Sequence, residues 1–329
     1  MKYLNCKVAV IGEGKMIPSV VCCLLNAGHQ VKCFSSQDPA EEVIRLAEIS
    51  GQSLYGTNDW EVNLDNNTSL RKFPLVVAIT SEKAEEKGNW LKKIDQATDQ
   101  NALIAINSES IPLDQLQNQM QASTRLVGLN WTYPAHQTFF AEVIANQQTD
   151  AEMVGDLMAI VRTAWEKDPY LLKGGRGIRS RLMAAMAREA FYLVGNGYVE
   201  VADIDRACRN DPGYYLPFAG NCRYMDLMGT FIYGVVMKDL NPELSNAREV
   251  PGFFDEMMDR DLGEKGTAQG FYSHTPSDVE KLEHSFLEFS REMRALMERY
   301  PFPKDGAPEE AWMAPESNKF SRGNKSKKQ

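Results

Sequence analysis

The sequence lacks any run of about 20 apolar residues, the length that a helix needs to cross a bilayer, so no membrane contact is expected. Residues 1–11 hold too short an apolar run for a signal peptide and instead predict a first strand. The six cysteines lack the spacing of zinc sites, so no metal is expected. We interpret them as small core residues in a reducing compartment, which predicts a cytoplasmic protein.

Acidic residues also outnumber basic ones. The chain has 36 Lys and Arg against 45 Asp and Glu, a net charge of −9. Binding to phosphate backbones requires a basic surface, which argues against nucleic acid as the main partner. With 329 residues, of which 43 % are hydrophobic, the chain is long enough for two domains with a sizeable core.

The first half alternates short apolar runs with helical patterns. The runs of strand length are Lys7–Ile11, Val31–Phe34, Leu75–Ile79, Leu103–Ile106 and Leu126–Leu129. The helical stretches between them include Pro18–Ala27, Pro39–Ser50 and Ala84–Ala97. Strand–helix alternation with buried strands predicts an α/β fold in which helices cover both faces of a parallel sheet.

Strand patterns become scarce after residue 150, and the second half is typical of an all-α domain. The predicted helices are Gly177–Gly195, Val201–Cys208, Arg223–Met237, Pro251–Arg260 and Ser277–Tyr300. A glycine-rich break at 173–177 separates the halves. We therefore expect one domain over 1–172, a helical domain over 173–300 and a flexible tail over 301–329, which is rich in Pro, Gly, Ser, Asn and Lys.

A glycine loop follows the first predicted strand and precedes the first predicted helix. Gly12 and Gly14 match the first two glycines of the Gly-x-Gly-x-x-Gly fingerprint, which allow a tight turn and a close approach to a pyrophosphate. Lys15 and Met16 lie in the same loop and are expected cofactor contacts. Ile17 occupies the third glycine position, where its bulk is expected to push the helix outward.

The end of the second predicted strand does not decide which dinucleotide binds. NAD sites usually place Asp or Glu near Ser35 to hold the ribose hydroxyls. A serine there removes the carboxylate that would repel a 2′-phosphate, yet no arginine follows to bind that phosphate. NAD and NADP both remain open, and so does a Rossmann domain with weakened dinucleotide binding.

Four segments together resemble the 3-hydroxyacyl-CoA dehydrogenase family, which includes lambda-crystallin-type L-gulonate dehydrogenases and carnitine dehydrogenases. The segments are Asn107-Ser-Glu-Ser-Ile-Pro, Gly128–Glu142, Gly177-Ile-Arg-Ser-Arg-Leu and Gly270-Phe-Tyr-Ser-His. The resemblance implies a Rossmann-like doubly wound sheet followed by an all-α dimerisation domain. It also implies a homodimer that uses NAD or NADP on a small-molecule substrate.

Three of the four catalytic positions of the family differ in this chain. The catalytic histidine falls on Asn130, the substrate-binding serine on Glu109 and an asparagine on Ser180, whereas the glutamate that orients the histidine is retained as Glu142. A carboxamide cannot act as a base. Two further family positions, Glu82 and Asn107, are expected beside the cofactor.

Other side chains could supply the missing base. Glu109 could accept a proton, because a carboxylate in an apolar site can have a raised pKa. Tyr133 could protonate a carbonyl, and His136 could turn toward the site. Trp131 and Arg223 complete the predicted substrate pocket, with Arg223 facing a substrate carboxylate. Each also has a structural interpretation as a pocket wall, a polar loop residue or a surface ion pair.

The segment Gln37–Leu75 is short for the helical hairpin with which the family binds acyl-CoA, which favours a smaller or differently carried substrate. The alternative is that the contacts with CoA lie elsewhere in the chain. Two alternative functions are compatible with these features. One is an NAD(P)-dependent oxidoreductase that interconverts a hydroxy and a keto group on a small acid or acyl thioester. The other is a catalytically inactive relative that binds a ligand or a partner. We favour the oxidoreductase, because folds of this kind usually keep a ligand.

Overall fold

The computed structural model describes residues 2–62, 64–65, 68–259 and 270–301. The chain divides into two compact units, which are considered separately. The first comprises Met1–Arg188 together with Gly252–Arg291, and the second comprises Glu189–Pro251 together with Glu292–Gln329. The predicted boundaries at 172 and 300 stay predictions, and residues 302–329 of the expected tail lie outside the described part of the chain.

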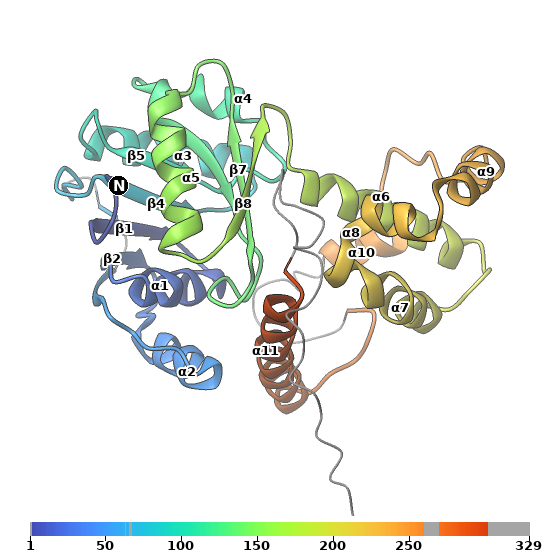
Figure 1. The fold of residues 1–329 in the computed structure, drawn as a ribbon. Helices are drawn as coiled ribbons and strands as arrows, with labels where there is room; N and C mark the ends of the chain where they lie inside the picture. Colours follow the sequence, from blue (N-terminus) through green and yellow to red (C-terminus); the bar gives the residue numbers. More distant parts are fainter. Residues whose placement is uncertain (1, 63, 66–67, 260–269, 302–329) are drawn as a thin grey trace, which may run out of the picture. The chain divides into compact units, whose positions relative to one another are not determined.

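The first unit is built on an eight-stranded sheet (Figure 1). Its strands are β1 (Lys7–Gly12), β2 (Gln30–Ser35), β3 (Thr57–Val62), β4 (Leu75–Ile79), β5 (Leu103–Ile106), β6 (Leu126–Asn130), β7 (Phe140–Ala145) and β8 (Asp168–Lys173). Their order is β3-β2-β1-β4-β5-β6-β7-β8. The strand order reverses between β1 and β4, and ligands of such sheets bind at the carboxyl ends of the strands beside this point.

Helices cover both faces of the sheet, as the sequence predicts. α1 (Met16–Asn26), α2 (Ala40–Ser50) and α5 (Ala151–Thr163) pack on one face, and α3 (Ala84–Ala97) and α4 (Leu113–Gln117) pack on the other. Successive residues of β1 alternate between the two cores: Val8 and Val10 join the first, and Ala9 and Ile11 join the second. The doubly wound α/β fold is therefore confirmed.

Three strands have no counterpart among the predicted elements, namely β3, β7 and β8. β3 and β8 lie at the two edges of the sheet, where half of each strand is exposed and the apolar pattern is weak. β7 pairs antiparallel with β6, whereas every other pair is parallel. A short 3₁₀ helix, η1 (Ser123–Arg125), precedes β6.

The remainder of the described chain is helical, which confirms the predicted all-α region. Its helices are α6 (Ile178–Gly195), α7 (Val201–Asn210), α8 (Pro212–Met228), α9 (Thr230–Leu240), α10 (Gly252–Asp259) and α11 (Pro276–Arg299). The single helix predicted over Arg223–Met237 was wrong. Gly229, with a φ of 101°, ends α8 and starts α9. Over the described residues, no helix is long and apolar enough to span a bilayer.

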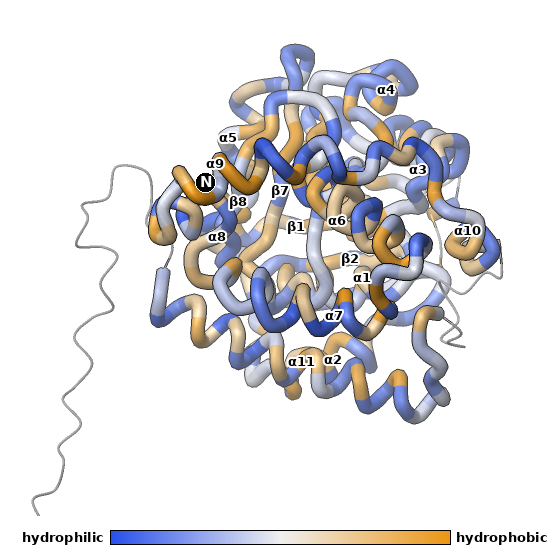
Figure 2. Tube along the Cα trace, turned by 90° about the vertical axis from the view of Figure 1, so that its right-hand side faces the viewer, coloured by the Kyte–Doolittle hydropathy of each residue, from blue (hydrophilic) through white to orange (hydrophobic). Residues whose placement is uncertain are grey.

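The N-terminal part of α11 belongs to the first unit. Polar and apolar residues alternate along it, as Figure 2 shows. Its Leu287 is fully buried in the core that α1 and α5 share. Beside it, Glu283 accepts a hydrogen bond of 2.8 Å from the Tyr133 hydroxyl, and Phe286 stacks on the Tyr133 ring. This helix therefore anchors the loop that follows β6.

Candidate active site

The glycine loop between β1 and α1 has the backbone that a dinucleotide site requires. Gly12 has a φ of +148°, and a Cβ there would lie 1.8 Å from the carbonyl oxygen of Ile79. Gly14 has a φ of +84° and is exposed, with nothing within 4 Å of the place of a Cβ. Only glycine adopts such conformations readily. The open backbone at Gly14, beside the N-terminus of α1, fits a pyrophosphate.

The predicted cofactor residues near this loop differ in burial. Lys15 is exposed and Met16 half-buried, whereas Ile17 is buried and packs close to Gly12. Ser35, the predicted ribose contact, is buried, and its hydroxyl donates to the carbonyl of Gln37. An outward shift of α1 and a ribose contact by Ser35 stay predictions.

At the carboxyl ends of β4 and β5, Asn107 contacts Glu82, so that two predicted cofactor residues lie together. Its Nδ2 donates to the Thr80 carbonyl at 2.9 Å and to Glu82 Oε1 at 2.7 Å. The fully buried Lys87 Nζ donates to Asn107 Oδ1 at 2.9 Å and pairs with Glu82 at 3.1 Å. Burial lowers the pKa of Lys87, and the Glu82 carboxylate opposes that effect.

Sequence reasoning missed Lys87. The signal was present, because Lys87 shares one helical face with the buried Leu91 and Ile94, four and seven residues later. A lysine in the apolar stripe of a helix requires buried acceptors, and these are the side chain and carbonyl of Asn107. Lys87 thus holds the ends of two central strands together.

Asn130, at the end of β6, is 1 % exposed, and its amide is occupied by the protein itself. Its Oδ1 accepts from the backbone N–H of Ser108 at 2.7 Å. Its Nδ2 donates to Glu142 Oε2 at 2.8 Å and to the Ser108 carbonyl at 3.3 Å. Asn130 therefore contacts the glutamate as a hydrogen-bond donor, and its carboxamide cannot act as a base.

Glu142 is fully buried on β7 and is satisfied by four groups. Besides Asn130, Tyr170 donates to it at 2.8 Å, and the backbone N–H of Ile178 donates at 2.7 Å, with Arg179 N at 3.4 Å. The last two belong to the first turn of α6, where the helix dipole favours a negative charge. Burial raises the pKa of Tyr170, and its hydrogen bond to Glu142 adds to that shift.

A glycine permits this close approach. A Cβ on Gly177 would lie 2.1 Å from Glu142 Oε2 and 3.2 Å from Asn130 Nδ2. The start of α6 can therefore reach the carboxylate only when residue 177 has no side chain. This explains physically why a glycine opens the segment that resembles the family motif.

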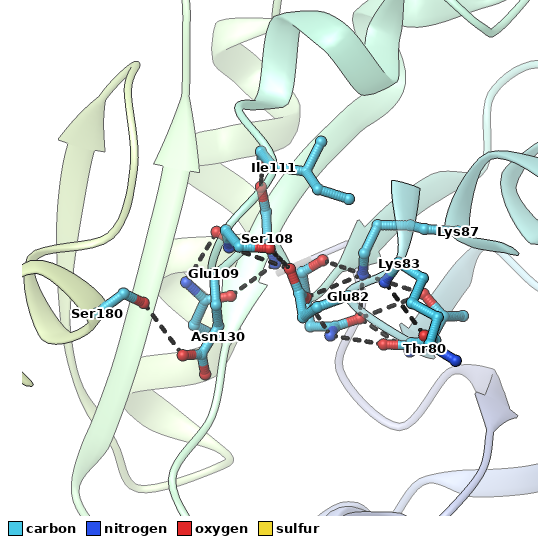
Figure 3. Close-up of polar contacts among 12 residues, drawn as sticks. Thr80, Glu82, Lys83, Lys87, Ser108, Glu109, Ile111, Asn130 and Ser180 are labelled. Atoms are coloured by element: carbon cyan, nitrogen blue, oxygen red, sulfur yellow. Dashed lines mark hydrogen bonds and ion pairs between the residues drawn. The ribbon is translucent and has the colours of Figure 1, made fainter. Parts of the chain in front are cut away.

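Glu109 and Ser180 come together, as Figure 3 shows, and a residue that the sequence reasoning missed joins them. Arg179 Nη1 donates to both oxygens of Glu109, at 2.9 and 2.7 Å, and the Ser180 hydroxyl donates at 3.1 Å. The Glu109 and Arg179 side chains are 31 % and 28 % exposed. In contrast to Glu142, Glu109 is a carboxylate that a ligand can reach.

The predicted pocket residues lie in different surroundings. Trp131 is buried and stacks on Trp165, and His136 is buried between the hydroxyls of Ser19 and Ser50, at 2.9 and 2.8 Å from its two ring nitrogens. Tyr133 is half-buried, with Lys15 Nζ 5.9 Å from the centre of its ring. Burial raises the pKa of Tyr133, and Glu283 raises it further.

Arg223 belongs to α8 in the second unit. Its contact with a substrate carboxylate stays a prediction, as do the pocket roles of Trp131, Tyr133 and His136. Among the described residues, His, Cys, Asp and Glu side chains form no group of three or more that could hold a metal ion.

Two family models match the chain. The NAD-binding domain of 3-hydroxyacyl-CoA dehydrogenase matches residues 7–174, and the C-terminal domain of the same enzymes matches residues 178–274. The chain belongs to the 3-hydroxyacyl-CoA dehydrogenase family. The resemblance drawn from the sequence is thereby confirmed, and a nicotinamide cofactor is supported.

Relatives within the family differ in what they act on. The chain is 26 % identical over 288 residues to 5-formyl-3-hydroxy-2-methylpyridine 4-carboxylate 5-dehydrogenase of Mesorhizobium japonicum, covering 84 % of this chain and 93 % of that one. It is 24 % identical to the fatty acid oxidation complex subunit alpha of Shewanella frigidimarina, covering 82 % of this chain and 39 % of that one.

Solved structures agree with the fold. The crystal structure of the 5-formyl-3-hydroxy-2-methylpyridine 4-carboxylic acid 5-dehydrogenase, an NAD⁺-dependent dismutase, superposes with a TM-score of 0.78 at 25 % identity, covering 89 % of this chain and 98 % of that one. (S)-3-Hydroxybutyryl-CoA dehydrogenase from Ralstonia eutropha has a TM-score of 0.60 at 21 % identity, covering 82 % and 99 %. The second likeness concerns the fold alone.

Proposed function

We propose that this family member is an NAD-dependent oxidoreductase that interconverts a hydroxyl and a carbonyl group on a small carboxylic acid. One observation carries the proposal: Glu109, held by Arg179 and Ser180, is a reachable carboxylate beside the buried Asn130–Glu142 pair. It occupies a position that the resemblance assigns to a substrate-binding residue. Glu109 therefore offers a carboxylate that can accept a proton, although the resemblance places the family's histidine on Asn130.

Glu109 acts as the proton acceptor in this proposal. When the alcohol is oxidised, its O–H proton passes to Glu109, and the hydride leaves the carbon with its electron pair as the carbonyl forms. NAD, when bound, would supply the hydride acceptor, and Gly12, Gly14 and the N-terminus of α1 would hold its pyrophosphate. Because Glu109 is 31 % exposed, the proton can continue to solvent.

The neighbouring residues orient Glu109. Arg179 contacts both of its oxygens, a geometry that fixes a carboxylate in one plane. Glu142 in turn binds the backbone N–H groups of Ile178 and Arg179 and so positions the first turn of α6. Asn130 completes the chain of contacts by binding both Ser108 and Glu142. Asn130 and Glu142 are thus positioning residues.

The connection after β2 supports a small substrate. Between β2 and β3 the chain forms a single helix, α2, of 11 residues, in place of the long hairpin that the resemblance associates with acyl-CoA. By its name, the Mesorhizobium japonicum relative acts on a pyridine that carries a formyl group and a carboxylate.

A homodimer belongs to the same proposal, and so does a cytoplasmic location, which the cysteine pattern predicts. α8 and α9 expose many large apolar side chains. Among them are Tyr214 (85 %), Leu227 (67 %), Phe231 (82 %) and Ile232 (64 %). Apolar residues colour much of α9 orange in Figure 2. Apolar exposure on this scale supports an interface with a second copy.

The proposal is tested by following NADH absorbance with the full chain and two substrate classes. One class is hydroxymethyl- and formyl-bearing aromatic carboxylates, and the other is 3-hydroxybutyryl-CoA. We expect kcat/KM for a small acid to exceed that for the thioester by about tenfold or more, because unmatched binding groups are costly. Turnover of the thioester alone would overturn the small-acid assignment.

One observation favours a second candidate, a catalytically inactive relative. Both ends of the Asn130 amide and both oxygens of Glu109 are already engaged by the protein. The same assays separate the candidates, because the inactive relative would turn over neither class. Measured binding of NADH without turnover would then favour a ligand-binding role.

A further inference from the structure

A carboxylate reaches the end of β2 from the glycine loop. Glu13 stands between Gly12 and Gly14 and is exposed. The backbone N–H of Ser36, the first residue after β2, donates to Glu13 Oε1 at 3.0 Å and to Oε2 at 3.1 Å. The Ser36 hydroxyl donates to the same carboxylate. Glu13 therefore bridges the carboxyl ends of two adjacent parallel strands.

This is the place where dinucleotide sites usually need an acid. An Asp or Glu at the end of the second strand normally accepts hydrogen bonds from the adenosine ribose. Ser35 fills that sequence position, but it is 4 % exposed and its hydroxyl donates to the Gln37 carbonyl. Asp38 accepts from the backbone N–H of Ala40 at the start of α2. Asp38 is also exposed, but Glu13 is the carboxylate that contacts the backbone at the end of β2.

We propose that Glu13 replaces the missing strand-end acid, binds the adenosine ribose hydroxyls and selects NAD over NADP. The proposal rests on the nicotinamide-dependent function proposed above. A carboxylate offers about four lone-pair positions, so Glu13 can accept from a ribose while it is held by Ser36. Because Ser36 holds the Glu13 carboxylate before the ligand binds, little conformational entropy is lost on binding.

The surrounding charges favour the same selectivity. A 2′-phosphate carries about −1.5 to −2 charges at neutral pH and would meet the Glu13 carboxylate. Residues 36–44 contain no Lys or Arg to offset that repulsion, and Arg45 is paired with Glu42 at 2.6 Å. NADP would therefore be disfavoured even though the sequence position of the usual acid is a serine.

The test is a calorimetric titration of the full chain with NADH and with NADPH. Wild type should bind NADH at least about tenfold more tightly, as expected for a lost charged hydrogen bond and a like-charge contact. In the isosteric Glu13→Gln variant, NADH binding should weaken about tenfold and the preference for NADH should largely disappear. The control Glu41→Gln, on the exposed first turn of α2, should leave both affinities unchanged.

A second variant tests the nucleotide preference independently. Ser36→Arg adds a cation beside the carboxylate and should raise NADPH affinity relative to NADH by about tenfold, most strongly when combined with Glu13→Gln. An unchanged preference in Glu13→Gln, or loss of preference in Asp38→Asn instead, would overturn the assignment while leaving the proposed function intact. If wild type binds neither nucleotide, both the assignment and the proposed function fail.

Discussion

At the scale of single residues, the site depends on a buried carboxylate that needs every one of its partners. Glu142 is fully buried and is balanced by a carboxamide, a phenol and the first N–H groups of α6. A buried carboxylate is tolerated only when such donors satisfy its oxygens. Any change that separates α6 from β7 should therefore weaken both the fold and the orientation of Arg179.

Gly177→Ala should destabilise the protein by about 1–3 kcal/mol, because its Cβ would lie 2.1 Å from Glu142 Oε2 and force the helix start away. Gly155→Ala is the matched control, since nothing lies within 4 Å of that position on α5. The control should be neutral or stabilising by up to about 1 kcal/mol. Urea unfolding measures both, and equal effects of the two substitutions would refute the account of Gly177.

His29 should make stability depend on pH. The buried ring lies between the Cys6 carbonyl (Nδ1, 3.2 Å) and the Trp165 N–H, which donates to Nε2 at 2.9 Å, so it accommodates the neutral form. Burial lowers its pKa, although the Cys6 carbonyl opposes the shift. Below the ordinary pKa of about 6.5, the unfolded ring binds a proton that the folded ring does not.

The stabilisation by neutral His29 is therefore complete above about pH 6.5 and is lost as the pH falls toward the folded pKa, by at most about 1.4 kcal/mol per pH unit. The free energy of unfolding, measured in urea at several pH values between neutral and mildly acidic, should show this slope. His29→Gln should reduce it. An identical slope in both proteins would contradict the role of His29.

At the scale of elements, α11 should stabilise the first unit through one buried side chain. Leu287→Ala should cost about 2–5 kcal/mol, because Leu287 is fully buried in the α1–α5 core. Leu282→Ala on the same helix is the control, since Leu282 is 58 % exposed, and should change stability by less than about 0.5 kcal/mol. Unfolding monitored by circular dichroism compares them, and a small loss for Leu287→Ala would refute this docking.

The sequence predicted the central elements better than those at the edges. β1, β4 and β5 are buried on both faces and therefore appear as continuous apolar runs. β3 contains Asn58, Asp59 and Glu61, and such an edge strand has no apolar run to detect. The break between α8 and α9 depends on the backbone of Gly229, which helical periodicity cannot indicate.

The sequence predicted which residues form the candidate site, but only some of the contacts between them. Motif spacing brought Asn130, Glu142, Glu109 and Ser180 into one group, and the structure shows contacts within it. The ion pair of Glu109 with Arg179 and the reach of Glu13 were not predictable, because they depend on side-chain direction across strands distant in sequence. Periodicity describes single elements and carries no such information.

At the scale of the whole molecule, apolar exposure on α9 should drive self-association. Full-length protein should sediment at twice the mass of one chain. Phe231→Glu should raise the dimer dissociation constant by about 30-fold or more, because an aromatic side chain that is exposed in one chain and covered by the second copy is a typical interface anchor. Tyr55→Glu, at a 74 % exposed position of the first unit, is the control. A monomeric wild type at micromolar concentration would refute the interface.

The family fold is kept, and the glycine loop, Glu142 and the glycine before α6 belong to it. Three of the four positions to which the resemblance assigns catalysis carry different side chains. Folds determine where chemistry can occur, and side chains determine which chemistry occurs. We propose that Glu109 takes the proton-accepting role that the resemblance assigns to the position of Asn130.

That transfer is tested most directly by the turnover number of Glu109→Gln with NAD and the best small-acid substrate. We expect kcat to fall by about 100-fold or more, the usual contribution of a general base, with NADH affinity unchanged. Glu85→Gln, an exposed change on α3, should retain full activity. A Glu109→Gln variant that keeps the wild-type kcat would contradict the assignment of Glu109 as the base.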